Sequence, residues 1–222
     1  MFENTIQELG GILSQLEGNR VDPKDAPRIA YRQKVRQDAR QAQLLSAKAV
    51  EERGRARASD SPERIKDLEQ ALAMYTALYS KEQQMIGIRN YALFYRSGVH
   101  ATLGKSIDAI DGFQRIADLE GVDVLRPLQT SAITELIKLL AAEGKYPLAV
   151  DRATQWMSDL RPDERHAETV ELQLELARVR MAWSEILKEK DPKDRTAGRL
   201  LDDARRFACV APNRRTTPGR NS

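Results

Sequence analysis

The chain has little cysteine and no long apolar run, and each scarcity excludes a class of structure. One of its 222 residues is cysteine, Cys209, so no disulfide can form within the chain and the redox compartment stays open. No apolar stretch approaches the ~20 residues that a membrane-spanning helix needs. The start, Met1 to Asn4, lacks the basic residues and apolar core of a signal peptide. For a complete chain, the default expectation is therefore a cytoplasmic protein.

Glycine, proline and aromatic residues are also few. The 12 glycines and 9 prolines fall mostly between apolar runs, and aromatic residues make up 5% of the chain against 31% charged residues. This composition is typical of a solvated all-α protein in which alanine and leucine fill the helix contacts. No segment shows the alternating pattern of a β-strand.

Charge is distributed unevenly along the chain. Residues 28–57 hold nine basic and three acidic residues, and residues 193–222 hold eight basic and three acidic residues. The first 27 residues have a net charge of −3 and residues 58–192 a net charge of −5. The pI near 9.0 thus reflects two basic segments around a mildly acidic middle.

Apolar spacing predicts the helices. A first, short helix is indicated by one stripe at Phe2, Ile6, Leu9, Leu13 and Leu16, followed by a loop to Pro27. A long helix is expected over 28–57, with a stripe of Tyr31, Val35, Ala39, Ala42, Leu45 and Ala49. Ser61 is expected to cap the next helix, with Pro62 in its first position. Further helices are predicted near 83–103, 105–119, 128–143, 146–160, 163–189 and 195–210.

Two of the predicted turns share one pattern, 40 residues apart. Gly104-Lys105 and Gly144-Lys145 each end an apolar helical run, and each is followed at the same offset by an alanine, Ala109 or Ala149. Internal similarity at such a period indicates an array of helical repeats. A single helix pair cannot bury its apolar face, so neighbouring pairs must stack.

These repeats resemble the tetratricopeptide repeat, an antiparallel helix pair that stacks into a superhelix. The resemblance covers roughly residues 89–162 and rests on the following positions: Leu93, Ser97, His100, Gly104, Ala109 and Phe113 in one unit, and Ile133, Leu136, Leu140, Gly144, Tyr146 and Ala149 in the next. It implies an all-α superhelix of antiparallel pairs with about eight helices. Arg96, Ile116, Ala153 and Trp156 depart from the family pattern, as does the period of 40.

The resemblance also implies a concave groove lined by the first helix of each pair, which would bind a protein or peptide partner. Carried over by position, the groove-facing candidates are Tyr91, Phe94, Tyr95 and Gly98 in one unit and Ser131, Thr134 and Lys138 in the next. Tyr91, Phe94 and Tyr95 are the only aromatic cluster. They fit a peptide-binding surface or, as the alternative, ordinary packing between helices.

A basic helix supports a second hypothesis. Arg28, Arg32, Arg36 and Arg40 step by four, so they could form one ridge that contacts nucleic-acid phosphates. The alternatives are a solvated face or a face that docks on an acidic neighbour.

The residues that could carry chemistry do not form a site. His100 and His166 have no metal-ligand partner at helical spacing, and His100 falls on a repeat packing position. Cys209 is interpreted as a core residue, and the adjacent pairs Glu51-Glu52 and Asp202-Asp203 as solvated surface. We therefore predict no cofactor, no metal and no enzymatic activity.

The sequence thus predicts a non-catalytic scaffold or adaptor. Its expected parts are an N-terminal helix and loop (1–27), a repeat domain (28–212) and a disordered basic tail (213–222). Because no polar capping helix follows the last predicted helix, we also expect the chain to be part of a longer one or to self-associate through that end.

Overall fold

The computed structural model describes residues 24–82, 84–164 and 166–209, together with residues 4, 7, 8, 10–12, 14 and 15. Within these residues the structure is helical and contains no strand. The apolar stripe predicted from Phe2 to Leu16 and the predicted tail 213–222 lie outside the described residues, except that the described positions from 4 to 15 are helical. Self-association through the C-terminal end stays a prediction.

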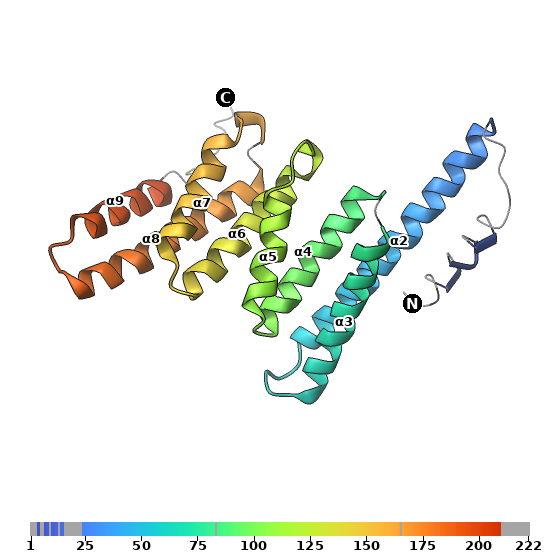
Figure 1. The fold of residues 1–222 in the computed structure, drawn as a ribbon, viewed down its shortest axis with the longest axis horizontal. Coiled ribbons are helices and arrows are strands. Elements are labelled where there is room, and N and C mark those ends of the chain that lie inside the picture. Colours follow the sequence, from blue (N-terminus) through green and yellow to red (C-terminus); the bar gives the residue numbers. More distant parts are fainter. Residues whose placement is uncertain are drawn as a thin grey trace, which may run out of the picture. The chain divides into compact units, whose positions relative to one another are not determined.

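Eight α-helices follow one another in the described chain and agree closely with those predicted (Figure 1). They are α2 (Ala26–Arg55), α3 (Pro62–Lys81), α4 (Ile86–Thr102), α5 (Ser106–Ala117), α6 (Arg126–Ala142), α7 (Tyr146–Asp159), α8 (Ala167–Lys190) and α9 (Arg195–Cys209). Two 3-10 turns, Asp123–Leu125 and Pro162–Glu164, precede α6 and α8. The all-α class is therefore confirmed.

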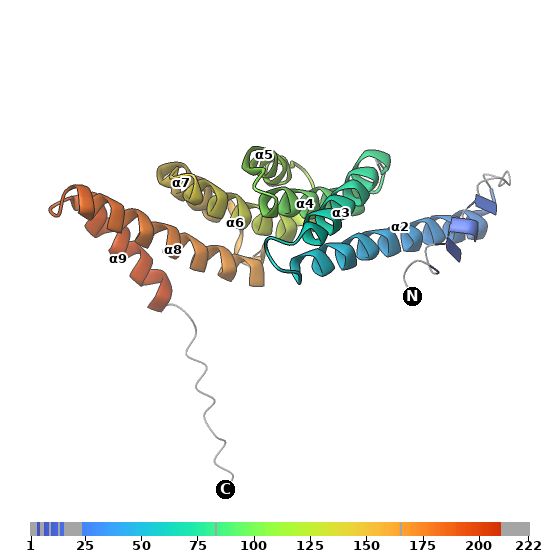
Figure 2. The ribbon, with the colours of Figure 1, turned by 90° about the horizontal axis from the view of Figure 1, so that it is seen from below.

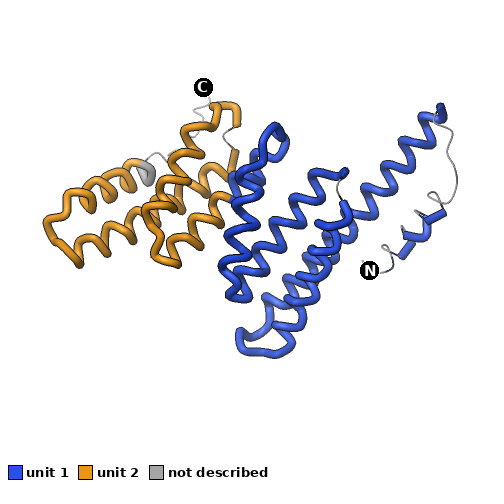
Figure 3. The backbone as a smooth tube through the Cα atoms, in the orientation of Figure 1, with its two compact units in different colours: residues 1–132 blue, residues 133–222 orange. Residues whose placement is uncertain are grey.

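The chain divides into two compact units, residues 1–132 and residues 133–222 (Figure 3). The first contains the pairs α2/α3 and α4/α5 and the start of α6. The second contains the remainder of α6, with α7 and the pair α8/α9. Both Figure 1 and Figure 2 show α9 lying along α8.

The two Gly-Lys turns have the same backbone structure, which explains the repeated sequence. Gly104 and Gly144 have φ angles of 73° and 75°, a left-handed conformation that glycine adopts without steric cost. The N–H of Lys105 donates to the His100 carbonyl at 2.9 Å, and that of Lys145 donates to the Leu140 carbonyl at 2.8 Å. This is the Schellman arrangement that closes a helix.

Each lysine then begins the next helix. The carbonyl of Lys105 accepts from Ala109 N–H, and that of Lys145 accepts from Ala149 N–H, both at 3.1 Å. Ala109 and Ala149 are fully buried, as their small size at the predicted packing positions requires. The sequence repeat is thus a repeat of helix, glycine turn and helix.

Close helix crossings in the first unit depend on glycine. A Cβ placed on Gly112 of α5 would lie 2.0 Å from Ser97 Oγ of α4, and one on Gly54 of α2 would lie 3.1 Å from Asp67 Cβ of α3. The core nearby is formed by Ala47, Leu68, Ala71, Tyr75 and Val99, all fully buried. Gly112 is therefore part of the α4/α5 packing, a role that the repeat pattern did not predict.

Three local predictions about α2 and α3 need correction. Val35 and Ala39 of the predicted α2 stripe are buried as expected, but Tyr31 and Leu45 are 54% and 46% exposed, because the buried face of the helix continues through Ala47. Ala49 is also exposed. Ser61 precedes α3 as expected, but its hydroxyl donates to the Glu63 carboxylate at 2.6 Å and makes no capping bond to the backbone.

Only one of the two adjacent glutamates, Glu51 and Glu52, is exposed to solvent. Glu52 is exposed, but Glu51 is 2% exposed. Tyr75 of α3 donates its hydroxyl to Glu51 at 2.8 Å, and Arg55 donates to the same carboxylate at 2.8 Å. Burial, followed by the charge of Glu51, raises the pKa of Tyr75. The prediction of a solvated pair was wrong for Glu51 because α3 covers it.

Candidate partner-binding groove

A groove of about 700 Å³ lies between α2 and α4, within the first unit. One wall is α2 and the other is the segment from Gln84 into α4. Its lining residues are Gln33, Arg36, Gln37, Gln41, Leu44, Leu45, Gln84, Met85, Gly87, Ile88, Tyr91 and Tyr95. The α4 wall carries the predicted candidates Tyr91 and Tyr95, whereas the α2 wall lies outside residues 89–162, which the resemblance covers.

The α2 wall is built by helical periodicity. Gln33, Gln37 and Gln41 step by four, and the same face continues into Leu44 and Leu45. The three glutamine side chains are exposed. A carboxamide both donates and accepts hydrogen bonds, so these side chains can pair with N–H and C=O groups of an incoming backbone.

The α4 wall supplies aromatic and apolar surface. Tyr91 is 39% exposed, and its ring stacks on that of Tyr95 with centroids 6.3 Å apart. Tyr95 also stacks on buried Tyr75 at 5.6 Å, which ties it to the core. Lys48 of α2 places its Nζ 4.4 Å from the centroid of the Tyr95 ring. Tyr91 and Tyr95 thus form a partly exposed aromatic surface that is anchored to the core through Tyr75.

Not all of the predicted groove residues lie in this groove. Phe94 is partly buried and packs edge-on against buried Phe113 of α5 and against Tyr95, with centroids 5.4 Å and 5.6 Å apart, and it is not among the lining residues. Gly98 is not among the lining residues, and a Cβ there would lie 3.7 Å from an Arg55 nitrogen. Within the aromatic cluster, Tyr91 and Tyr95 line the groove, whereas Phe94 takes part in packing between helices. Peptide binding by Tyr91 stays a prediction.

The candidates of the next helix have other environments. Thr134 is 1% exposed, so its side chain is buried and not available to a ligand. Ser131 is partly buried. Lys138 forms ion pairs with Glu135 at 2.7 Å and Glu171 at 3.8 Å. Desolvation alone would lower the pKa of Lys138, but the neighbouring carboxylates raise it overall.

The predicted arginine ridge is not one uniform surface. Arg28 is exposed at the start of α2, and Arg32 is half-buried. Arg36 lines the α2/α4 groove, whereas Arg40 forms an ion pair with Glu82 and donates to Gln43 at 3.1 Å. Arg40 is therefore not part of an exposed ridge, because Glu82, which follows α3, lies against α2 and pairs with it.

The glutamine stripe was not among the predicted site residues. Gln33, Gln37 and Gln41 have the same four-residue spacing as the arginines but lie on another face of α2. The signal that could have identified them is a polar stripe that turns apolar at Leu44 and Leu45 without a change of register.

The remaining candidates for chemistry do not gather at the groove. His100 is held near Asp108, with 3.9 Å between Nδ1 and the carboxylate, and burial lowers the pKa of its imidazole. His166 is exposed before α8, and the side chain of Cys209 lies outside the described part. No group of three or more His, Cys, Asp or Glu residues in the described ranges could hold a metal ion. None of the described helices is long and apolar enough to cross a membrane.

Comparison with known proteins gives one weak structural likeness. No protein-family model matches the chain, and no curated protein matches it. A solved structure, that of a "Podosopora anserina putative kinesin light chain" with "nearly identical TPR-like repeats", is similar with a TM-score of 0.48 and 16% identity. The alignment covers 94% of this chain and 87% of that one. The fold assignment therefore rests on this chain's own helix pairs and repeated glycine turns.

Helix pairs that follow in chain order agree with the tetratricopeptide-like arrangement expected from the sequence. The two Schellman turns recur at the repeat period of 40 residues. Within the first unit, α2 lies beside α4, and the groove lies between them.

Proposed function

We propose that this tetratricopeptide-like chain is a non-catalytic interaction module that binds a peptide segment of a protein partner in the α2/α4 groove. The observation that carries the proposal is the lining itself. Exposed glutamine carboxamides form one wall of a groove of about 700 Å³, and an aromatic and apolar surface forms the other. Such a surface can satisfy a peptide backbone and bury apolar side chains at the same time.

Rigidity of the site supports the same proposal. Tyr95 stacks on fully buried Tyr75, and Tyr75 donates to buried Glu51. A wall held in this way loses little conformational entropy when a ligand binds. A peptide gains affinity from a groove that is already formed.

Selection of ligands from a random-peptide display library tests this function. The immobilised chain should enrich peptides with a shared pattern, and their affinity should fall at least tenfold for Tyr91→Ala. The matched control is Ile107→Ala, which removes an 83% exposed apolar side chain from α5 outside the groove. Peptides that bind all three proteins equally would contradict the proposal.

Nucleic-acid association is the second candidate, since residues 28–57 have a net charge of +6. Arg28, Arg32 and Arg36 would contact the phosphates. Arg40 would not, because it pairs with Glu82. Fluorescence anisotropy with a 20-nucleotide RNA or a 20-base-pair DNA at 50 and 200 mM salt tests it. Binding that falls steeply with salt and is lost in Arg28→Glu/Arg32→Glu would favour this candidate.

A further inference from the structure

Three arginine side chains from two helices of the first unit converge on one tyrosine of a third helix. Tyr79 belongs to α3, and α4 packs against both α3 and α5. The guanidinium carbons of Arg89 and Arg96, both on α4, lie 4.9 Å and 4.7 Å from the centroid of the Tyr79 ring. Arg89 also donates to the phenolic oxygen at 3.5 Å, and Arg115 of α5 forms a hydrogen bond with the same tyrosine. We call these four side chains the Tyr79 cluster.

The Tyr79 cluster carries positive charge that its own residues do not cancel. Arg115 pairs with Asp111 at 2.9 Å. In the described part of the chain, no ion pair joins Arg89 or Arg96 to a carboxylate, and the Nε of each is buried without a hydrogen-bond partner. An aromatic ring attracts a guanidinium but does not neutralise its charge. Three guanidiniums and one carboxylate thus leave a net charge of +2.

The tyrosine hydroxyl shows how this charge acts on an anion. Burial alone would raise the pKa of Tyr79, but the hydrogen bonds from Arg89 and Arg115 lower it overall. The cluster therefore stabilises negative charge at the position of the phenolic oxygen. Tyr79, Arg89 and Arg96 are partly buried, whereas the side chain of Arg115 is 58% exposed, so a solvent-borne anion can approach the cluster beside Arg115.

We propose that the Tyr79 cluster binds the dianion of a phosphate monoester. Such a group carries about two negative charges at pH 7 and presents three acceptor oxygens, which matches the uncompensated charge. A single carboxylate would leave one guanidinium uncompensated. Planar guanidinium forks can also bind phosphate through two hydrogen bonds each. None of the four side chains lines the α2/α4 groove, so the site goes beyond the proposed function and does not depend on it.

Titration of the full chain, labelled with ¹⁵N-arginine, with phenyl phosphate tests the site by NMR. The Nε–H groups of Arg89 and Arg96 are suitable probes, because burial slows the exchange of their protons with water. We expect saturable shifts at both groups, assigned with Arg89→Lys and Arg96→Lys. Acetate at the same ionic strength should bind at least tenfold more weakly. Absence of a saturable shift, or equal affinity for acetate, would overturn the proposal.

Matched variants separate a local site from general charge attraction, with binding followed by the ³¹P signal of phenyl phosphate. Arg89→Gln/Arg96→Gln should weaken binding at least tenfold. Arg178→Gln/Arg205→Gln removes the same charge from two exposed side chains of α8 and α9 and should change the affinity less than twofold. Equal losses in the two variants would overturn the proposal.

A milder variant guards against loss of folding. Arg96→Lys keeps the positive charge and removes the planar fork, so it should retain the circular dichroism spectrum and bind phenyl phosphate at least threefold more weakly. Unchanged affinity in this folded variant would contradict binding by the Arg96 guanidinium.

Comparison with a phosphoserine peptide flanked by glycines distinguishes two sources of the phosphate. At least tenfold tighter binding of the peptide would assign the site to a phosphorylated polypeptide. Equal affinity for the peptide and for phenyl phosphate would assign it to a small phosphorylated molecule. Both results support a phosphate site, whereas binding of the unphosphorylated peptide with equal affinity would overturn it.

Discussion

At the scale of single residues, the neighbouring glutamates of α2 have opposite environments. Glu51 is 2% exposed and accepts hydrogen bonds from Tyr75 and Arg55, whereas Glu52 is exposed and pairs with Lys48 at 3.5 Å. One residue along a helix is a rotation of about 100°, which is enough to move a carboxylate from solvent to the α2/α3 interface.

This difference gives a stability prediction. Glu51→Ala leaves the Tyr75 hydroxyl and the Arg55 guanidinium without their acceptor, so the free energy of unfolding should fall by about 1–3 kcal/mol. Glu52→Ala should change it by less than about 0.5 kcal/mol. Urea unfolding followed by circular dichroism measures both, and equal effects would contradict the buried role of Glu51.

Gly112 provides a second prediction at this scale. An added Cβ would lie 2.0 Å from Ser97 Oγ, which itself donates to the Leu93 carbonyl at 2.8 Å. Gly112→Ala should therefore destabilise the first unit by about 1–3 kcal/mol, as overpacked positions do. Thermal unfolding provides the measurement.

The matched control lies in the same helix pair. At Gly98 an added Cβ would make only an ordinary contact, 3.7 Å from Arg55. Gly98→Ala should stabilise the protein by about 0.5–1 kcal/mol, because alanine is the better helix former. A Gly112→Ala variant as stable as Gly98→Ala would show that the α4/α5 crossing is looser than described.

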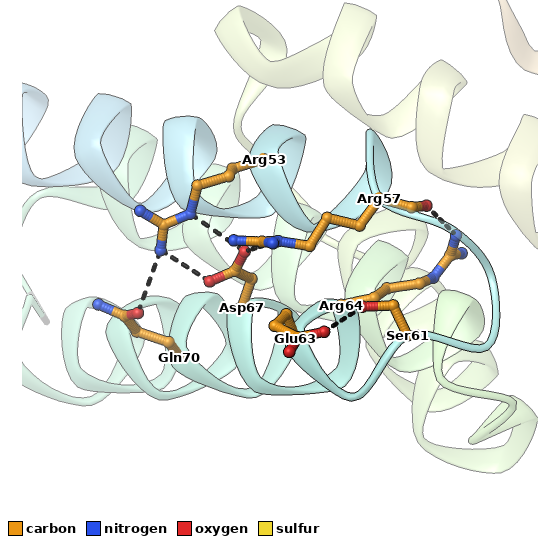
Figure 4. Close-up of polar contacts among 7 residues, drawn as sticks. All are labelled: Arg53, Arg57, Ser61, Glu63, Arg64, Asp67 and Gln70. Atoms are coloured by element: carbon orange, nitrogen blue, oxygen red, sulfur yellow. Dashed lines mark hydrogen bonds and ion pairs between the residues drawn. The ribbon is translucent and has the colours of Figure 1, made fainter.

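At the scale of helices, a carboxylate holds the end of α2 to α3 (Figure 4). Asp67 of α3 accepts from Arg53 at 2.7 Å and from Arg57 at 2.7 Å, and Arg53 also approaches Gln70 at 3.5 Å. These hydrogen bonds, from Arg53 first and Arg57 second, lower the pKa of Asp67. The contact joins the two helices on either side of the loop from 56 to 61.

The lowered pKa predicts how this contact depends on pH. The folded state favours the ionised form, so its contribution is fully present above the unfolded pKa of about 3.9 and is lost as pH falls through the lower folded value. Wild type should exceed Asp67→Asn in urea midpoint at pH 7 and at pH 5. The difference should shrink below pH 4. A difference that is constant from pH 7 to pH 3 would contradict this account.

The helices themselves were largely predictable, for a local reason. Their ends are marked by residues that act through their own backbone, such as Gly104, Gly144 and Pro62, and these signals need no knowledge of neighbours. The predicted helix over 105–119 is thus found as Ser106–Ala117, and that over 195–210 as Arg195–Cys209.

The orientation of helix faces was less predictable. Which side of α2 is buried depends on where α3 and α4 pack, and the predicted apolar stripe of α2 indicates it only for Val35 and Ala39. Tyr31 and Leu45 are exposed for this reason, and Glu51 is buried. Prediction fails where tertiary contacts choose between faces of similar polarity.

At the scale of the whole molecule, the residues predicted for the binding groove and for the arginine ridge have different environments. Tyr91, Tyr95 and Arg36 line one groove, but Phe94, Thr134 and Arg40 are taken up by other contacts. The resemblance, which covers residues 89–162, indicated the α4 wall through Tyr91 and Tyr95 but not the α2 wall. It could not indicate the glutamine stripe, because those side chains belong to this chain and not to the repeat pattern.

The central claim is that a partner peptide occupies the α2/α4 groove, and hydrogen–deuterium exchange tests it most directly. The chain is compared with and without a saturating display-selected peptide. We predict slower exchange at residues 33–45 and 84–95, with no change at 106–117, the residues of α5. Protection confined to residues outside the groove, or no protection at saturation, would contradict the claim.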